Sequence, residues 1–442
     1  MNFDDTIQSK ILLTPSEGLV FSSNKNGTCT LKKLGKCRDL DIVIPKISPT
    51  GETVTVIGKK AFAGCKKLTS VRFPDTIIAI GEGAFKQCES LIQITLPANI
   101  QSVEKEAFSG CNSLLEISLP DSLTCIGEHA FENCNQLKSI VLPNGITEIK
   151  KKTFSSCCAL TSITLPETLT NIFEYAFENC NGIKTIVVPD SVIQIGFSAF
   201  AGCSSLTKIT LPFLGPAKNE ETASKKTHLG YIFGTKQYVG SVSTETLPEW
   251  KTGRDSTLYY LPNALKEVTI TGGVIFREAF KNCQRITSIL LGDGVTAIQS
   301  SAFVMCKNLK SIHIGTGVKT LSNSFFSNCP NLKDVFLSNG LTHIEGHAFS
   351  DISKITSITI PSSVTFIEHW AFSVTSNPSQ IIFENPNNWK VQEGVPHWHA
   401  ECSFKYTSTE FISLSSSDLT NPSTASQYLH GTYHHYNWYH NS

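Results

Sequence analysis

A repeat with a period of 23 residues runs through most of this 442-residue chain. The segment IGKKAFAGCKKLTSVRFP at 57–74 returns as IGEGAFKQCESLIQITLP at 80–97 and as IGEHAFENCNQLKSIVLP at 126–143. A phenylalanine marks every copy, at Phe62, Phe85, Phe108, Phe131, Phe154, Phe177, Phe200, Phe280, Phe303, Phe326, Phe349 and Phe372. A fixed period of this length is the signature of a solenoid, in which each repeat forms one turn of the stack.

The LxxIxLP part of each repeat alternates as a β-strand does. In the first copy Val71 and Phe73 are predicted to point into the core, and Ser70 and Arg72 to point outward. Successive strands are predicted to stack in parallel about 4.8 Å apart. The proline that follows has no N–H to donate and is predicted to end each ladder. One repeat cannot bury its apolar side chains alone, so stability is expected to come from contacts between neighbouring turns.

The pattern LxxIxLPxxLxxIgxxAFxxC resembles the BspA-like (Treponema-type) leucine-rich repeat family, and the match covers residues 57 to about 372. The resemblance implies a right-handed leucine-rich-repeat solenoid with a parallel β-sheet on its concave face. Short second strands and single helical turns would complete each repeat, so the chain would be mostly β with little helix. The family's fold is a scaffold for display, so the resemblance specifies the fold far more sharply than the function.

The repeat also predicts the organisation of the chain. Residues 1–56 are predicted to form an N-terminal cap, with short strands around a turn at Asn26-Gly27. Residues 57–372 would form the solenoid. Within it, 213–264 is interpreted as one enlarged repeat, because LGYIFG imitates the IGxxAF segment, and its polar flanks at 216–228 and 235–257 are expected to be loops open to protease. Residues 373–442 are predicted to close the other end as a C-terminal capping segment.

Charge excludes some classes of partner. The chain has 37 basic and 37 acidic residues, so it lacks the basic footprint of a nucleic-acid-binding protein. No apolar run is long enough to predict a transmembrane helix. The N-terminus MNFDDTIQSK has no apolar region of the kind found in secretory signals. The resemblance implies a cell-surface or secreted protein, whereas the chain taken as complete would be expected in the cytoplasm.

Ten of the fifteen cysteines occupy one column of the repeat, at Cys65, Cys88, Cys111, Cys134, Cys157, Cys180, Cys203, Cys283, Cys306 and Cys329. A metal or redox role is one interpretation of such a column. We favour the other, a small buried apolar residue, because Ile352 and Thr375 fill the same column later and no CxxC motif occurs.

Nothing in the sequence predicts catalysis or a cofactor. There is no phosphate-binding loop, no HExxH and no GxSxG motif. The tail is rich in histidine, and His430 and His434 are spaced for one face of a helix. An aromatic cap is the preferred interpretation of this tail over a metal site, so we predict no catalytic, cofactor-binding or metal-binding residues.

The candidate partner-binding residues are Leu290, His313 and Phe336. They occupy one outward column on consecutive strands, a position where only Val141 and Val187 are apolar in the first seven copies. They are predicted to form a contiguous strip on the sheet, which is often the mark of an interaction site. Alternatively, the loops of the enlarged repeat fold over this strip and bury it.

These observations predict a non-catalytic scaffold of the surface or adhesion type that binds proteins through its concave face. The expected partner is a protein, for example on a host cell or another cell surface, and a glycan is the alternative. An intracellular structural or interaction protein is the rival hypothesis. A glycan-binding protein, or an enzyme with a site in the insertion, is the weaker one.

Overall fold

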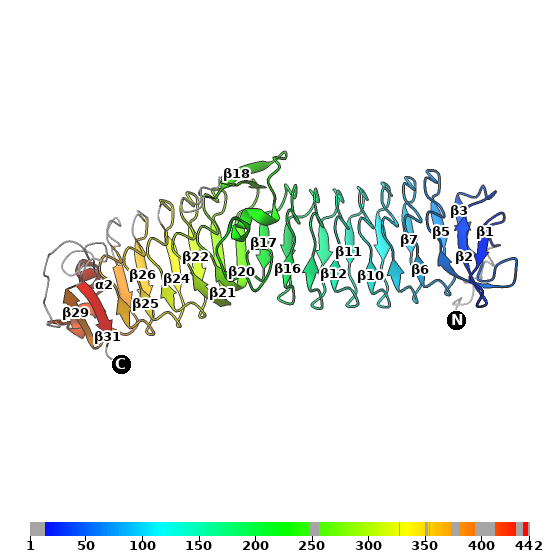
Figure 1. Cartoon of the computed structure of the whole chain (residues 1–442). Helices are drawn as coiled ribbons and strands as arrows, with labels where there is room; N and C mark the ends of the chain where they lie inside the picture. The colour runs from blue at the N-terminus through cyan, green and yellow to red at the C-terminus, as the bar shows by residue number, and fades with distance from the viewer. Residues whose placement is uncertain are drawn as a thin grey trace, which may run out of the picture. The chain divides into compact units, whose positions relative to one another are not determined.

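The structure is a computed structural model, and the chain divides into two compact units, Met1–Leu169 and Thr170–Ser442, which are described separately (Figure 1). The described residues are 14–246, 256–326, 328–349, 352, 354–372, 380–393, 412–429 and 436–440. Each unit is built from stacked turns of the repeat with parallel β-sheets, and the fold is the leucine-rich-repeat solenoid that the period predicts.

The first unit begins with the predicted hairpin. Strands β1 (Val20–Ser23) and β2 (Thr28–Lys33) pair antiparallel around Asn26-Gly27. Gly27 has φ 77°, a conformation that costs glycine little. β2 then pairs in parallel with β4 (Thr53–Ile57), so the hairpin joins the first regular turn. The second, shorter strands follow in the same sheet: β6 (Ala79–Ile80), β8 (Ser102–Val103) and β10 (Cys125–Ile126).

The LxxIxL strands of the first unit are β3 (Asp41–Val43), β5 (Ser70–Arg72), β7 (Gln93–Thr95), β9 (Glu116–Ser118), β11 (Ser139–Val141) and β13 (Ser162–Thr164). β12 (Glu148–Ile149) is the last of the second short strands in this unit. Equivalent residues pair directly, as Ile94 does with Ile117. Ile94 is buried whereas its neighbours Gln93 and Thr95 are exposed, so the predicted inward and outward alternation is confirmed.

The marker phenylalanines form a buried ladder. In the first unit the ring centroids of successive residues from Phe62 to Phe154 are 5.1, 5.3, 5.6 and 5.6 Å apart, with the rings within 9° of parallel. The backbone is joined at the same point, because the Phe62 amide donates to the Ala84 carbonyl of the next turn at 2.8 Å. Each ring therefore contacts the rings of both neighbouring turns.

The cysteine column is part of the same ladder. The Cys88 thiol donates to the Phe62 carbonyl at 3.2 Å, and the Cys111 thiol donates to the Phe85 carbonyl at 3.2 Å. Burial raises the pKa of Cys111 to about 12. All cysteines of the described residues are free. Burial also raises the pKa of Cys88, so these two thiols are protonated hydrogen-bond donors at neutral pH, which agrees with a structural role.

Two residues of each regular turn have left-handed backbone conformations. Lys60 (φ 55°) and Gly64 (φ 75°) flank Phe62, two residues before it and two after. The left-handed position two residues after the phenylalanine often holds Gly or Asn, the residues that tolerate this conformation best. In the Phe303 turn this position is Met305 (φ 62°), and its Cβ makes the left-handed conformation strained.

Met305→Gly is therefore expected to stabilise the protein by about 0.5–1 kcal/mol, despite the larger unfolded-state entropy of glycine. Chemical denaturation of the full chain measures the difference. Val304→Gly, at the adjacent position of ordinary backbone conformation, is the matched control and should destabilise. Equal destabilisation by both glycines would show that the strain at Met305 is negligible.

The second unit carries β15 (Thr185–Val187), β17 (Lys208–Leu211), β20 (Glu267–Ile275), β21 (Ser288–Ile298), β22 (Ser311–Ile314) and β24 (Asp334–Leu337) in one parallel sheet. β26 (Ser357–Ile360) and β28 (Gln380–Phe383) form a further parallel pair. The second short strands are β14 (Asn171–Ile172), β16 (Gln194–Ile195), β23 (Thr320–Leu321), β25 (His343–Ile344) and β27 (Phe366–Ile367).

Two strands of this sheet are longer than the repeat predicts. Thr271 and Gly292 replace the proline that follows β17 and the earlier strands, so their amides can donate. β20 and β21 pair as far as Ile275 and Ile298, with a register shift at which Thr271 and Gly292 themselves stay out of the ladder.

The insertion lies between β17 and β20. It contains the short 3-10 helices η1 (Lys225–Thr227) and η2 (Leu229–Ile232), and the antiparallel hairpin of β18 (Ser241–Glu245) and β19 (Leu258–Pro262). The expectation that its polar flanks are loops is therefore wrong for η1 and for β18. Both form because polar side chains satisfy them: Ser224 caps η1, and Thr244 of β18 is buried with its hydroxyl bonded.

Part of the insertion occupies the place of a repeat. Phe233 is fully buried, and the Phe200 amide donates to the Ile232 carbonyl at 2.9 Å, as Phe62 does to Ala84. β17 and β20 pair directly across the insertion. These contacts support the interpretation of 213–264 as one enlarged repeat, which stays a prediction.

If it is one repeat, cutting the chain between Thr246 and Ser256 should leave the two fragments associated. The β17–β20 and β18–β19 pairings both join residues from opposite sides of the cut. A protease recognition site placed there, followed by size-exclusion chromatography, measures the outcome. Fragments that separate without denaturant would make 213–264 a junction between domains. The uncut variant is the control for any effect of the added site.

A single backbone carbonyl anchors both halves of the insertion. Lys281 O accepts hydrogen bonds from His228 Nε2 at 3.0 Å and from Thr244 Oγ1 at 2.7 Å. The other ring nitrogen, His228 Nδ1, accepts from the Gly230 amide at 2.8 Å. Together these bonds define the neutral tautomer with its proton on Nε2, and burial lowers the pKa of His228 to about 4. We call this arrangement the His228 clasp.

The C-terminal end is closed by antiparallel strands that extend the sheet of β23, β25 and β27. β29 (Trp389–Glu393) pairs antiparallel with β30 (Ile412–Ser413) and β31 (Tyr436–His440), and β31 pairs with β27. The helices α1 (Ser416–Thr420) and α2 (Pro422–Gln427) contact β28. Trp389 and Trp438 are buried, in accord with an aromatic cap. Thr375, His430 and His434 lie outside the described residues, as do four further aromatic or histidine residues of the tail, His397, Trp398, His399 and His435.

Candidate partner-binding surface

Leu290, His313 and Phe336 lie side by side on β21, β22 and β24 (Figure 1). Leu290 pairs with His313, and His313 pairs with Phe336. The His313 and Phe336 rings stack with centroids 6.1 Å apart. Leu290 is 44% exposed and Phe336 is 56% exposed. The three side chains therefore form one exposed apolar strip, which we call the strip.

The strip points outward because its neighbours along each strand fill the core. Ile312 and Ile314 flank His313 on β22 and are both buried, and the same alternation holds on β21. Alternate side chains of a strand must point to opposite faces, so burial of one set exposes the other.

The column continues beyond the strip at the same 23-residue spacing. Thr359 on β26 is followed by Ile382 on β28, the two residues pair directly, and Ile382 is 39% exposed. Ile382 was missed in the sequence analysis, although the spacing from Phe336 identifies it. On the other side of the strip Leu290 pairs with Thr269, so the apolar run begins at Leu290.

The polar groups beside the strip are few and already bonded. Ser338 Oγ lies 3.4 Å from His313 Nε2. Asp293 accepts a hydrogen bond from the Thr316 amide at 2.8 Å, and hydrogen bonds from the Thr316 backbone and side chain lower the pKa of this carboxyl. Such groups can orient a partner at the strip.

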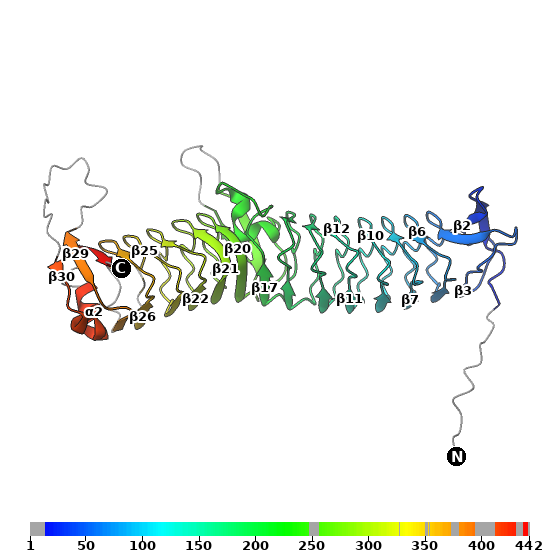
Figure 2. The ribbon, with the colours of Figure 1, turned by 90° about the horizontal axis from the view of Figure 1, so that it is seen from below.

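The described part of the insertion leaves the strip uncovered. Besides the His228 clasp, the Leu229 amide donates to the Ala279 carbonyl at 2.8 Å, so the insertion docks on the AFxxC segment of the next turn. In Figure 2 the helical part of the insertion lies on the side where β25 lies, away from β22 and β26. The alternative in which these loops bury the strip does not hold for the described residues.

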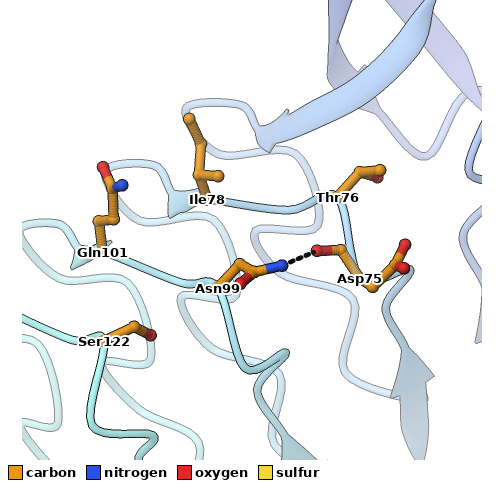
Figure 3. Close-up of a pocket in the computed structure, with 6 residues that line it drawn as sticks. All are labelled: Asp75, Thr76, Ile78, Asn99, Gln101 and Ser122. Atoms are coloured by element: carbon orange, nitrogen blue, oxygen red, sulfur yellow. Dashed lines mark hydrogen bonds between the residues drawn. The ribbon is translucent and has the colours of Figure 1, made fainter.

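The first unit offers a polar groove in place of a strip. Asp75, Thr76, Ile78, Asn99, Gln101 and Ser122 line a shallow groove of about 490 Å³ (Figure 3). Several of these groups are committed to the fold, since Asn99 Nδ2 donates to the Asp75 carbonyl at 3.0 Å and Thr76 Oγ1 donates to Val54 O at 2.6 Å. The exposed Val141 has no apolar neighbour in its column, where it pairs with Thr164.

Within the described ranges no three His, Cys, Asp or Glu side chains are grouped to hold a metal ion. Nor does any helix in those ranges have the length and apolar character needed to span a membrane.

Several solved structures with similarity to the chain are bacterial leucine-rich repeat proteins, and no curated protein matches it significantly. A leucine rich cell surface protein from Faecalibacterium prausnitzii A2-165 is 29% identical, with 84% of this chain and 94% of that chain covered and a TM-score of 0.44. The T. pallidum leucine rich repeat protein is 30% identical over 44% of this chain and 90% of its own, with a TM-score of 0.40. A leucine-rich repeat protein from Bacteroides ovatus ATCC 8483 is 24% identical over 84% and 99%, with a TM-score of 0.39.

The family comparison covers more than half of the chain. The model described as the BspA type leucine rich repeat region (6 copies) matches residues 42–157, 126–223 and 255–391. These matches span the Phe ladder, the cysteine column and the strip. The chain therefore belongs to the BspA-type leucine-rich repeat family.

Proposed function

We propose that this protein is a non-catalytic scaffold that binds a partner protein through the strip of Leu290, His313 and Phe336. Leucine-rich repeat proteins are typically protein-interaction scaffolds and are generally non-enzymatic. The observation that carries the proposal is the run of three exposed side chains on consecutive strands, in register, whereas other exposed apolar residues of the column stand singly. Contiguous exposed apolar surface is costly to leave in water and marks interaction sites more often than isolated residues do.

Phe336→Ala is expected to weaken partner binding by about 1–2 kcal/mol or more, roughly 5- to 30-fold in Kd, as the loss of an aromatic anchor does. The wild-type chain and the Phe336→Ala variant are each used as bait. For every protein that the wild type retains, the Kd is then measured with the wild type and with the variant.

The control for this experiment lies on the first unit. Ser162→Ala with Thr164→Ala changes the outward residues of β13 and should leave binding unaltered. Binding that survives Leu290→Ala with Phe336→Ala, but fails on the β13 control, would move the site to the first unit and refute the proposal.

We also propose the surface or adhesion-type form of this function that the family implies. Protease treatment of intact cells, followed by mass spectrometry of the released peptides, tests it. Peptides of this chain released before any cytoplasmic marker would support a surface role. Their absence, with the protein intact inside the cells, would favour the intracellular interaction protein.

A further inference from the structure

A row of lysines runs beside the strip, at the start of β22, of β24 and of the adjoining strand β20. Lys266, Lys310 and Lys333 occupy one column, with Thr287 in the remaining place. The backbone confirms this register, because the Lys310 amide donates to Thr287 O at 2.8 Å, the Thr287 amide to Lys266 O at 2.8 Å, and the Lys333 amide to Lys310 O at 3.0 Å. We call these three lysines the basic row.

The charge of the basic row is poorly compensated. Lys310 is exposed, and no described carboxylate lies within ion-pair distance of it. Lys266 lies near another cation, since burial and then the Arg285 guanidinium lower the pKa of this lysine. Lys333 reaches Asp334 at 3.8 Å, but both groups are about half exposed and such a pair is weak. Two acidic residues, Glu267 and Asp334, directly follow Lys266 and Lys333, and Glu267 pairs with Lys208 at 3.3 Å. With Arg285 beside Lys266, this edge of the strip still carries an excess of positive charge.

The opposite edge carries small residues and one exposed carboxylate, Asp293. Gly315 and Ser338 follow β22 and β24, and Gly292 occupies the equivalent position within β21. Gly315 packs closely on the turn before it, where an added Cβ would lie 2.5 Å from Gly292 C. The surface thus has an apolar centre, a positive edge at the strand starts and an edge without bulky side chains at the strand ends.

The dimensions of this surface fit a helix better than an extended chain. From Leu290 to Phe336 the strip crosses two strand spacings, about 9.6 Å. A helix laid along it presents an apolar side chain about every 5.4 Å, or 10.8 Å over the same two steps. An extended chain presents an apolar side chain on one face about every 6.6 Å, or about 13.2 Å over two steps. Its side chains therefore do not match the spacing of the strip. The basic row lies three residues from the strip, about 10 Å, which is about the width of a helix.

We propose that the strip binds an amphipathic helix of a partner protein that carries carboxylates along one flank. The apolar stripe of the helix lies on Leu290, His313 and Phe336, and its acidic flank lies on the basic row. This inference rests on the proposed function and specifies the chemistry of its partner.

The test uses the full-length chain and three designed peptides of 18 residues labelled for fluorescence anisotropy. The first carries leucines at i, i+4, i+7 and i+11 with glutamates along one flank. The second has lysines in place of those glutamates. The third keeps the first composition but contains a central proline, which breaks the helix. The acidic helix is expected to bind at least tenfold tighter than either of the others, and its affinity should fall with added salt.

Two double variants connect this preference to the surface. Lys310→Glu with Lys333→Glu should weaken the acidic helix at least tenfold and strengthen the basic one. Lys67→Glu with Lys138→Glu makes the same change of charge in the first unit, at exposed lysines, and should have little effect. Far-UV circular dichroism confirms that each variant is folded.

Several outcomes would overturn the inference. These are failure of the acidic helix to bind, equal binding of the proline peptide, or a preference that Lys310→Glu with Lys333→Glu does not change. Binding of the chain to phosphatidylglycerol vesicles, sensitive to Phe336→Ala, in place of peptide binding would instead identify a lipid surface. If a natural partner is lost on Phe336→Ala but unaffected by the charge reversal, the acidic helix is refuted and the proposed function stands.

Discussion

Phe131→Ala is expected to destabilise the first unit by about 3–5 kcal/mol, the cost of a large aromatic cavity in a packed core. The Phe131 side chain is fully buried, and its ring stacks on Phe108 and on Phe154 with centroids 5.6 Å away on both sides. The hydrogen bond from the Cys157 thiol to the Phe131 backbone carbonyl can remain in the variant, so the stability that is lost comes from side-chain packing. Chemical denaturation measures the total effect.

The distribution of this loss is as informative as its size. In a solenoid the contacts are made between neighbours, so hydrogen exchange should accelerate first in the turns of Phe108 and Phe154 and later in the β1–β2 hairpin. Val141→Ala, an exposed substitution in the following strand, is the control and should change stability by less than about 0.5 kcal/mol. Uniform loss of protection from the hairpin to Leu169 would contradict nearest-neighbour stabilisation.

Acidification is expected to weaken the docking of the insertion, because protonation of His228 breaks the His228 clasp. The fold favours neutral His228, because protonation of Nδ1 would abolish its bond from the Gly230 amide in a buried site. The folded pKa is about 4 against 6.5 for the ordinary group, so the stabilisation is complete above pH 6.5 and is lost as the pH falls from 6.5 to 4. That shift corresponds to about 3 kcal/mol.

The surroundings of the clasp decide how this prediction is tested. The Tyr259 ring stacks on His228 with centroids 5.5 Å apart, and Lys281 lies beside the Glu245 and Glu278 carboxylates. Because these groups also carry or gain charge, the wild type must be compared with His228→Asn. This variant keeps a side-chain acceptor for the Gly230 amide but has no imidazole to protonate.

Amide protection in 225–233 and 241–245, corrected for the intrinsic pH dependence of exchange, is the measurement. It should fall in the wild type from pH 6.5 to pH 4.5 and change much less in His228→Asn. Parallel pH profiles for the two proteins would show that the clasp does not control the insertion.

Much of this fold could be read directly from the chain because the contacts repeat at one separation. Phe62 meets Phe85, and Leu290 meets His313, because each residue contacts its equivalent 23 positions on. The period therefore predicts the ladder, the strands and the strip. It also identifies Ile382, which is absent from the predicted strip. The left-handed positions are partly visible too, as an excess of Gly and Asn two residues after the phenylalanine.

The tertiary structure alone decided the contacts that depart from this separation. The thiol of Cys88 bonds to a carbonyl 26 residues earlier, where the turn brings its side chain past Phe62. His228 and Thr244 lie 53 and 37 residues before Lys281, yet both donate to its carbonyl. A periodic sequence encodes contacts between equivalent positions, since burial of one column requires its neighbours. The docking of an aperiodic insertion depends instead on which backbone groups the stack leaves unpaired at its surface, and that is determined only when the turns are assembled.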